Sequence, residues 1–167
     1  YKVDLCIYDD TYAIFQENPD IKGIIHFAAY KAVGESVQNP IKYYENNING
    51  LLNLLRVAGL HNCNKLVFSS SATVYHPGNS IPYTERMRLG STSPYGWTKY
   101  MGEQIIRDCA KGGKIKPVLL RYFNPIGAHE SAEIGELPLG VPQNLVPFIT
   151  QTGIGLRQEL SVYGNDY

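Results

Sequence analysis

The chain has 167 residues, which allows one domain of the usual size with a sizeable core. Fifteen Lys and Arg residues balance fifteen Asp and Glu residues, and this zero net charge argues against a protein that binds nucleic acid or a membrane surface. Hydrophobic residues at 44% and charged residues at 18% exclude wholesale disorder. No apolar run approaches the roughly 18 residues that span a bilayer.

The three cysteines, Cys6, Cys63 and Cys109, are widely spaced and form no CxxC pair. This pattern predicts neither a disulfide framework nor a metal site, and it favours a reducing compartment, which we take to be the cytoplasm. The sequence begins at Tyr1 with no signal-peptide pattern and stops just after a strand-like stretch. We therefore expect an internal piece of a longer protein, with parts missing on both sides.

The first sixty residues alternate between β-rich runs and helical patterns. A strand is expected over Val3–Ile7, followed by a helix that Asp10 caps and that runs to about Asn18. The short apolar run over Gly23–Ala28 is typical of a strand buried on both faces. Apolar residues at three- and four-residue steps predict a helix over Ile41–Ala58, with Gly59 as its C-cap.

The same alternation continues after residue 60. Ser93 is a good N-cap and Pro94 suits a first helical turn, so a helix is expected from there to the Gly112–Gly113 stop. The other expected elements are a strand over Lys65–Ser69, a strand over Pro117–Phe123, a loop over 124–142, a short helix over Gln143–Thr152 and a strand over Leu160–Tyr163. This order predicts an α/β fold with a doubly wound, mainly parallel sheet.

Tyr95 and Lys99 are four residues apart in the predicted helix, so they share one face. A nearby ammonium lowers the pKa of a phenol, which can then act as a base near neutral pH. Ser69–Ser71 follow the strand before this helix, and ligands of doubly wound sheets lie at the carboxyl ends of strands. A strand-end serine together with the tyrosine and lysine is much less expected by chance than either feature alone.

The order of this Ser–Tyr–Lys set resembles that of the short-chain dehydrogenase/reductase superfamily, in its extended, nucleotide-sugar branch. Longer stretches resemble the UDP-glucose 4-epimerase family in particular, and together they cover essentially the whole chain. These stretches are residues 26–36, 69–75, 93–96, 120–129 and 164–167. The start of the chain, from Val3 to Cys6, is most similar to fungal members.

The resemblance implies an isomerase of galactose metabolism that interconverts UDP-glucose and UDP-galactose by reversible, NAD-dependent oxidation at C4 of the sugar. It implies that Tyr95 is the catalytic base, that Lys99 assists it and holds the nicotinamide ribose, and that Ser71 bridges Tyr95 and the 4-hydroxyl. The implied fold is a Rossmann-like NAD-binding domain over residues 1–123, followed by the start of a smaller UDP-sugar-binding region over residues 124–167. None of the sixteen glycines forms a GxGxxG or GxxGxxG turn, so the phosphate-binding end is expected upstream of Tyr1.

The resemblance also implies two sets of binding residues, named here by position in this chain. The positions that match NAD contacts are Asp4, Leu5, Phe27, Ala28, Ala29, Tyr30, Lys31, Asn46, Ser71, Tyr95, Lys99 and Phe123. The positions that match UDP-sugar contacts are Ser71, Tyr95, Asn124, Asn144, Leu145, Ser161, Val162 and Tyr163. No metal, nucleic acid or membrane partner is expected, and the full-length protein is expected to form a homodimer.

Several alternatives stay open at this point. A 4,6-dehydratase of the same superfamily needs an Asp–Glu pair where this chain has Ala72–Thr73, which disfavours it. A non-catalytic nucleotide-sugar sensor commonly loses the tyrosine or lysine, and this chain keeps both. UDP-pentoses and N-acetylated UDP-sugars remain possible substrates. Ala29, where many relatives have glycine, leaves affinity open, and the 167-residue piece alone is expected to be inactive.

Overall fold

The computed structural model describes residues 1–127, 129–136, 138, 140–162 and 164–165. The chain forms two compact units, residues 1–123 and residues 124–167. Each unit is described by itself below. Their assignment to NAD binding and to UDP-sugar binding stays a prediction.

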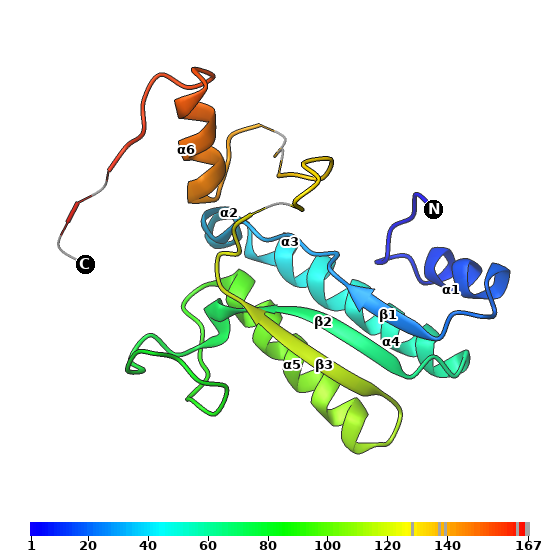
Figure 1. The fold of residues 1–167 in the computed structure, drawn as a ribbon. Coiled ribbons are helices and arrows are strands. Elements are labelled where there is room, and N and C mark those ends of the chain that lie inside the picture. Colours follow the sequence, from blue (N-terminus) through cyan, green and yellow to red (C-terminus); the bar gives the residue numbers. More distant parts are fainter. Residues whose placement is uncertain (128, 137, 139, 163, 166–167) are drawn as a thin grey trace. The chain divides into compact units, whose positions relative to one another are not determined.

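The first unit is built on a parallel three-stranded sheet (Figure 1). Its strands are β1 (Gly23–His26), β2 (Lys65–Ser71) and β3 (Lys116–Tyr122), in the spatial order β1-β2-β3. Gly23 pairs with Lys65 at one end of the sheet, and Ser71 pairs with Tyr122 at the other. Helical segments connect each strand to the next, so the predicted α/β class and parallel sheet are confirmed.

The helices of the first unit follow the expected pattern closely. They are α1 (Tyr8–Glu17), α2 (Val33–Gln38), α3 (Pro40–Tyr44), a π-helical turn (Glu45–Asn49), α4 (Gly50–Leu60) and α5 (Pro94–Lys111). The π-helical turn joins α3 and α4 directly, so these three segments form the helix that was predicted over Ile41–Ala58. Gly59 as C-cap was wrong, because α4 continues to Leu60 and the positive φ of 54° falls on Asn62.

Two apolar clusters form the core of this unit. One contains Phe15 of α1 together with Leu54 and Val57 of α4, and it fixes α1 against α4. The other lies between the sheet and the helices α4 and α5, and it consists of Leu51, Leu66, Phe68, Ile106 and Ile115. Burying such side chains contributes roughly 1.5–3 kcal/mol each, so these clusters set the position of α5 on the sheet.

The face of the sheet that points away from the helices is exposed, so the predicted burial of β1 on both faces was wrong. Ile25, Val67 and Val118 are register neighbours, and they alternate with Leu66 and Phe68, which pack toward the helices. In the described part of the chain Ile25 is 67% exposed and Val118 is 52% exposed. β1 is therefore covered on one face here, where burial on both faces was expected.

The segment before α1 is a turn, where a strand over Val3–Ile7 was expected. The carboxylate of Asp4 accepts a hydrogen bond from the Cys6 N–H at 2.9 Å, and its carbonyl accepts one from the Ile7 N–H at 3.0 Å. This local bonding of an aspartate to the backbone two residues on competes with strand pairing. Helix α1 then begins at Tyr8, so Asp10 lies in its first turn and is not the N-cap.

The start of α5 agrees with its sequence signals. The hydroxyl of Ser93 accepts a hydrogen bond from the Gly96 N–H at 3.2 Å, and Pro94 occupies the first turn. A Cβ at Gly96 would lie 1.9 Å from Ser91 Oγ and 3.0 Å from the Thr73 carbonyl oxygen. Only glycine allows the first turn of α5 to approach the loop after β2 this closely.

In the second unit, the described residues form one helix, α6 (Leu145–Gly153), close to the helix predicted over Gln143–Thr152. The strand expected over Leu160–Tyr163 is not seen at residues 160–162, and Tyr163 lies outside the described residues. A strand needs a neighbour for its backbone hydrogen bonds, and the described part of this unit contains none.

We predict opposite effects on stability for alanine at two helical glycines. A Cβ at Gly102 of α5 would lie 2.9 Å from Phe68 Cζ and 3.3 Å from Leu51 Cδ2, so Gly102→Ala overpacks the core and destabilises by about 1–2 kcal/mol. A Cβ at Gly59 of α4 would meet nothing within 4 Å, so the control Gly59→Ala stabilises by up to about 1 kcal/mol through helix propensity. Urea unfolding measures both. A Gly102→Ala variant as stable as the unaltered protein would contradict this packing.

Candidate active site

Helix α5 presents a row of polar side chains to the end of β2. Tyr95, Lys99 and Glu103 follow one another at four-residue steps, so they lie on one face of the helix. They are 9%, 5% and 1% exposed, respectively, which shows that this face is turned toward the sheet. This row packs against the backbone and the hydroxyl groups of Ser69–Ser71 at the end of β2.

Lys99 is the buried cation of the site. Its Nζ donates a hydrogen bond to the Ser69 carbonyl oxygen at 2.7 Å and lies 5.1 Å from the centre of the Phe68 ring. Burial lowers the pKa of Lys99 to about 8, so the ammonium form prevails at neutral pH. His26 also stacks on Phe68, and burial together with the nearby Lys99 lowers the pKa of His26 to about 4, so His26 is neutral at that pH.

Tyr95 differs from the expectation. Burial raises its pKa above the ordinary value, and a hydrogen bond with Ser71 lowers it only in part. The Lys99 ammonium lies 5.9 Å from the Tyr95 ring centre and is hydrogen-bonded to a carbonyl, so in the protein alone it does not bring the phenol below its ordinary pKa. Desolvation has a larger effect on the pKa of Tyr95 than the Lys99 charge, because both side chains are buried at the helix–strand contact.

Ser71 is held as a hydrogen-bond donor. Its Oγ accepts from the Thr73 N–H at 3.2 Å and from Thr73 Oγ1 at 3.0 Å. A hydroxyl has two lone pairs and one proton, so the two bonds from Thr73 leave the proton for donation. Donation from Ser71 to Tyr95 favours the phenolate, which is the direction that a base requires.

A cavity of about 320 Å³ gathers half of the residues that match NAD contacts. Its lining is Val3, Asp4, Leu5, Cys6, Ala28, Ala29, Tyr30, Asn46 and Gly50. The volume falls in the range of small-molecule sites, roughly 300–1,000 Å³. Six residues of the predicted set therefore meet, although Asp4 and Asn46 are 42 positions apart in the printed sequence. A cofactor fits these residues because they combine backbone, carboxylate and amide groups around an open cavity.

Six further positions predicted for cofactor contact lie outside this cavity, and three of them, Phe27, Lys31 and Phe123, are exposed. Phe27 lies with its ring centre 6.3 Å from that of Tyr122. Phe123 is 6.3 Å from Tyr75 and 6.1 Å from Tyr83 between ring centres, so it belongs to an aromatic cluster beyond the end of β2. Lys31 lies just before α2.

Asn47 was not among the predicted site residues, yet it joins the cavity to α5. Its Oδ1 accepts from the Tyr30 N–H and from Asn46 Nδ2, both at 2.9 Å. Its Nδ2 donates to the Tyr30 carbonyl at 3.1 Å and to Thr98 Oγ1 at 3.0 Å. All four hydrogen-bonding positions of the amide are used. The signal in the sequence is a pair of poor helix formers, Asn46 and Asn47, inside a helix, and π-helical turns are frequent at functional sites.

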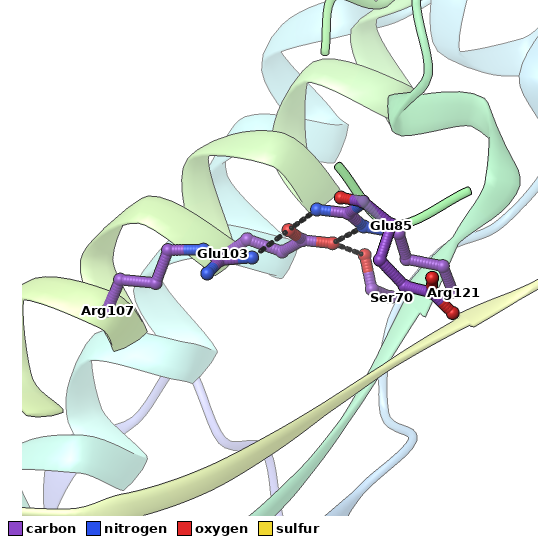
Figure 2. Close-up of polar contacts among 5 residues, drawn as sticks. All are labelled: Ser70, Glu85, Glu103, Arg107 and Arg121. Carbon is purple, nitrogen blue, oxygen red and sulfur yellow. Dashed lines mark hydrogen bonds and ion pairs between the residues drawn. The ribbon is translucent and has the colours of Figure 1, made fainter. Parts of the chain in front are cut away.

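A second set of residues missed from the sequence surrounds Glu103, and we call it the Glu103 network: Ser70, Glu85, Glu103, Arg107 and Arg121 (Figure 2). The carboxylate of Glu103 accepts from Ser70 Oγ at 2.6 Å, from Arg121 Nε at 2.8 Å and from Arg121 Nη2 at 2.7 Å. These bonds hold the pKa of Glu103 below its ordinary value although burial opposes them. The network ties α5 to both β2 and β3.

The second unit has a cavity of about 430 Å³ of its own. It is lined by Pro142, Gln143, Asn144, Leu145, Phe148, Leu160, Ser161 and Val162. Asn144, Leu145, Ser161 and Val162, which match UDP-sugar contacts, thus lie together. Asn124 is exposed and does not line this cavity, and Tyr163 lies outside the described residues.

The parallel sheet and its helices define a Rossmann-like α/β protein, and Ser71, Tyr95 and Lys99 are buried at the carboxyl end of β2, where ligands of such folds bind. The chain belongs to the NAD dependent epimerase/dehydratase family, which matches residues 1–147.

Individual relatives are similar over almost the whole chain. A bifunctional UDP-glucose 4-epimerase and UDP-xylose 4-epimerase of Pisum sativum is 50% identical over 98% of this chain and 47% of its own length. The structure of UDP-glucose 4-epimerase from Bifidobacterium longum in complex with NAD+ and UDP is 47% identical, with a TM-score of 0.93 over 100% of this chain and 50% of that one. The enzyme from Stenotrophomonas maltophila, with bound NAD and formylated UDP-arabinopyranose, is 43% identical with a TM-score of 0.93 over 100% and 50%. The chain therefore spans about half the length of the proteins it matches.

None of the helices in the described ranges is both long enough and apolar enough to cross a membrane. Nor do the described residues bring three or more His, Cys, Asp or Glu side chains together where they could hold a metal ion.

We predict that Asn47→Asp destabilises the protein by about 2–3 kcal/mol. The aspartate loses both donated bonds and sets a carboxylate oxygen against the Tyr30 carbonyl at a position that is 7% exposed. Asn49→Asp is the matched control, because Asn49 is an exposed residue of the same π-helical turn and should change stability by less than about 0.5 kcal/mol. Equal urea midpoints for the two variants would contradict the linking role of Asn47.

Proposed function

We propose that the protein containing this chain is an NAD-dependent UDP-glucose 4-epimerase, an isomerase that interconverts UDP-glucose and UDP-galactose in galactose metabolism. The observation that carries the proposal is the burial of Tyr95 and Lys99 beside Ser71 at the carboxyl end of β2. The family membership and the similarity to UDP-glucose 4-epimerases support the same activity.

In this proposal Tyr95 takes the proton of the sugar's 4-hydroxyl and later returns it to the 4-oxygen of the product. Ser71, whose lone pairs are occupied by Thr73, donates its proton either to the phenolate of Tyr95 or to the sugar oxygen. Lys99 stays charged below a pH of about 8 and stabilises the phenolate from its buried position. Bound NAD supplies the acceptor for the C4 hydride, which makes the oxidation reversible.

The raised pKa of Tyr95 implies that this side chain acts as a base only in certain surroundings. A phenol that is protonated in the protein alone becomes a base only when positive charge and hydrogen-bond donors surround it. Ser71 and Lys99 provide part of that stabilisation. Without its ligands Tyr95 thus stays protonated, and proton transfer depends on their binding.

The cavity lined by Asp4, Leu5, Ala28–Tyr30 and Asn46 is proposed to hold part of NAD. Phe27, Lys31 and Phe123 are proposed to contact the cofactor outside that cavity, as are Ser71, Tyr95 and Lys99. The cavity of the second unit, with Asn144, Leu145, Ser161 and Val162, is proposed to hold part of the UDP-sugar. Asn124 and Tyr163 complete that proposed set.

A second substrate class has direct support. The relative from Pisum sativum is named for activity on UDP-xylose as well, and the structure from Stenotrophomonas maltophila contains a UDP-arabinopyranose derivative. UDP-pentoses are therefore proposed as alternative substrates. A 4,6-dehydratase is disfavoured, because Ala72 and Thr73 carry no carboxylate for the elimination. That the intact protein is a cytoplasmic homodimer, and that the 167-residue piece alone is inactive, stay predictions.

We predict that Tyr95→Phe lowers kcat by about a thousandfold or more, whereas binding of UDP-galactose changes little. The substitution removes the proton-transfer group and leaves the ring that packs in the site. A coupled assay of UDP-glucose formation and calorimetry measure the two quantities. Tyr100→Phe is the matched control, because Tyr100 lies on the same helix beside Trp97 and should leave kcat within about twofold. A kcat for Tyr95→Phe within tenfold of the unaltered enzyme would rule out Tyr95 as the base.

A further inference from the structure

The polar face of α5 meets the end of β2 residue by residue. Lys99 Nζ donates a hydrogen bond to the carbonyl of Ser69, and Glu103 Oε1 accepts one from the hydroxyl of Ser70. The hydroxyl of Ser71 lies near enough to Tyr95 to lower the pKa of the phenol. Three consecutive strand residues thus contact three helix residues at four-residue steps. A slip of α5 along β2 would break these contacts together.

The contact of Glu103 differs from the other two because it continues into β3. Arg121 is the register partner of Ser70, and its guanidinium binds both oxygens of the Glu103 carboxylate (Figure 2). The side chains of Glu103 and Arg121 are 1% and 8% exposed, respectively. One carboxylate therefore fixes α5 to two neighbouring strands at the level of the site.

A buried ion pair is weak evidence for a stabilising role. Desolvation of the two charges offsets much of their attraction, so apolar side chains of similar volume often stabilise a core as well. A carboxylate bound by a guanidinium does have a fixed geometry, because two parallel hydrogen bonds set both the distance and the angle between the two groups. The pair lies one helical turn after Lys99, so the geometry that it fixes also sets the orientation of the helix face that carries Lys99.

Arg121 also reaches the aromatic cluster that contains Phe123. Its guanidinium lies 4.9 Å from the centre of the Tyr75 ring, and its Nη1 donates to the Glu85 carbonyl at 3.1 Å. Tyr75 in turn stacks on Phe123. Through Glu103 the network is part of the row on α5, and through Arg121 it contacts Tyr75, which stacks on Phe123, a ring proposed to lie against the cofactor.

We propose that Ser70, Glu103 and Arg121 form a clamp that holds α5 in register with the end of β2 and thereby positions Tyr95 and Lys99 for proton transfer. These three are positioning residues, since they act through Tyr95 and Lys99. The role rests on the proposed epimerase function.

The test is Ser70→Ala in the intact, NAD-loaded protein, because this change removes one hydroxyl and no charge. The titratable and charged groups around the row are Lys99, Glu103 and Arg107 on α5, His26 on β1, Tyr75 after β2 and Arg121 on β3, and Ser70→Ala leaves all of them in place. A loosened clamp lowers kcat by about tenfold through misplacement of the base and leaves the KM for UDP-galactose within about twofold. It also moves the active limb of the kcat–pH profile upward by about half a pH unit, because a misplaced Lys99 and Ser71 stabilise the phenolate less.

Two further variants sharpen the result. Glu103→Gln removes the charge at the centre of the clamp and should lower kcat by about a hundredfold. Arg107→Gln is the matched control, because Arg107 contacts the same carboxylate at 3.3 Å but is 49% exposed and touches neither strand in this network. It should leave kcat and the pH profile unchanged. If Glu103→Gln does not fold, the comparison of Ser70→Ala with Arg107→Gln is by itself a sufficient test of the clamp.

A readout that needs no turnover separates this proposal from the proposed function. The ultraviolet difference between the unaltered protein and Tyr95→Phe reports the ionisation of Tyr95, and the same difference in the Ser70→Ala background should titrate at higher pH. A Ser70→Ala protein with reduced thermal stability but an unmoved Tyr95 titration would overturn the clamp. Absence of epimerisation by the unaltered protein would overturn the proposed function and leave this titration to decide on the clamp.

Discussion

The contact between the first half of α5 and the end of β2 is the constraint on which the rest of the site depends. Lys99 reaches across it to the Ser69 carbonyl, and Phe68 and Ile106 close the apolar core beside it. Gly96 and Gly102 allow the close approach, since a Cβ at either would meet neighbouring atoms within 3 Å. The packing of a helix start against a strand end thus sets the distance between Tyr95, the proposed base, and the Lys99 ammonium.

Burial in this contact determines the electrostatics. It lowers the pKa of Lys99 to about 8 and that of His26 to about 4, and it raises that of Tyr95. At neutral pH Lys99 is therefore a cation, Tyr95 is a protonated phenol and the neighbouring His26 is a neutral imidazole, whereas Glu103, whose pKa lies below its ordinary value, is an ionised carboxylate. The proposed proton abstraction by Tyr95 requires the surroundings to favour the phenolate, which would make the chemistry depend on ligand binding and on the register of α5 on the sheet.

The sequence could predict those features that depend on neighbours along the chain. Ser93 and Pro94 mark the start of α5, and the spacing of Tyr95 and Lys99 places both on one face, as found. The contacts of Glu103 and Asn47 could not be predicted, because their partners Arg121 and Thr98 are 18 and 51 positions away, although two asparagines inside a helix did mark Asn47 as unusual. The turn at Asp4, the helix end after Gly59 and the exposed face of β1 were missed because local signals do not say which neighbours a segment meets.

The central claim is that Lys99 is buried as a cation between α5 and β2, and its own titration tests this most directly. In the intact, cofactor-free protein, nuclear magnetic resonance of the lysine amino groups, with Lys99→Met to assign the signal, follows that titration. The account predicts a pKa of about 8 for Lys99. A value near the ordinary 10.5 would mean that Lys99 is solvated, and it would contradict the placement of the active-site row against the end of β2.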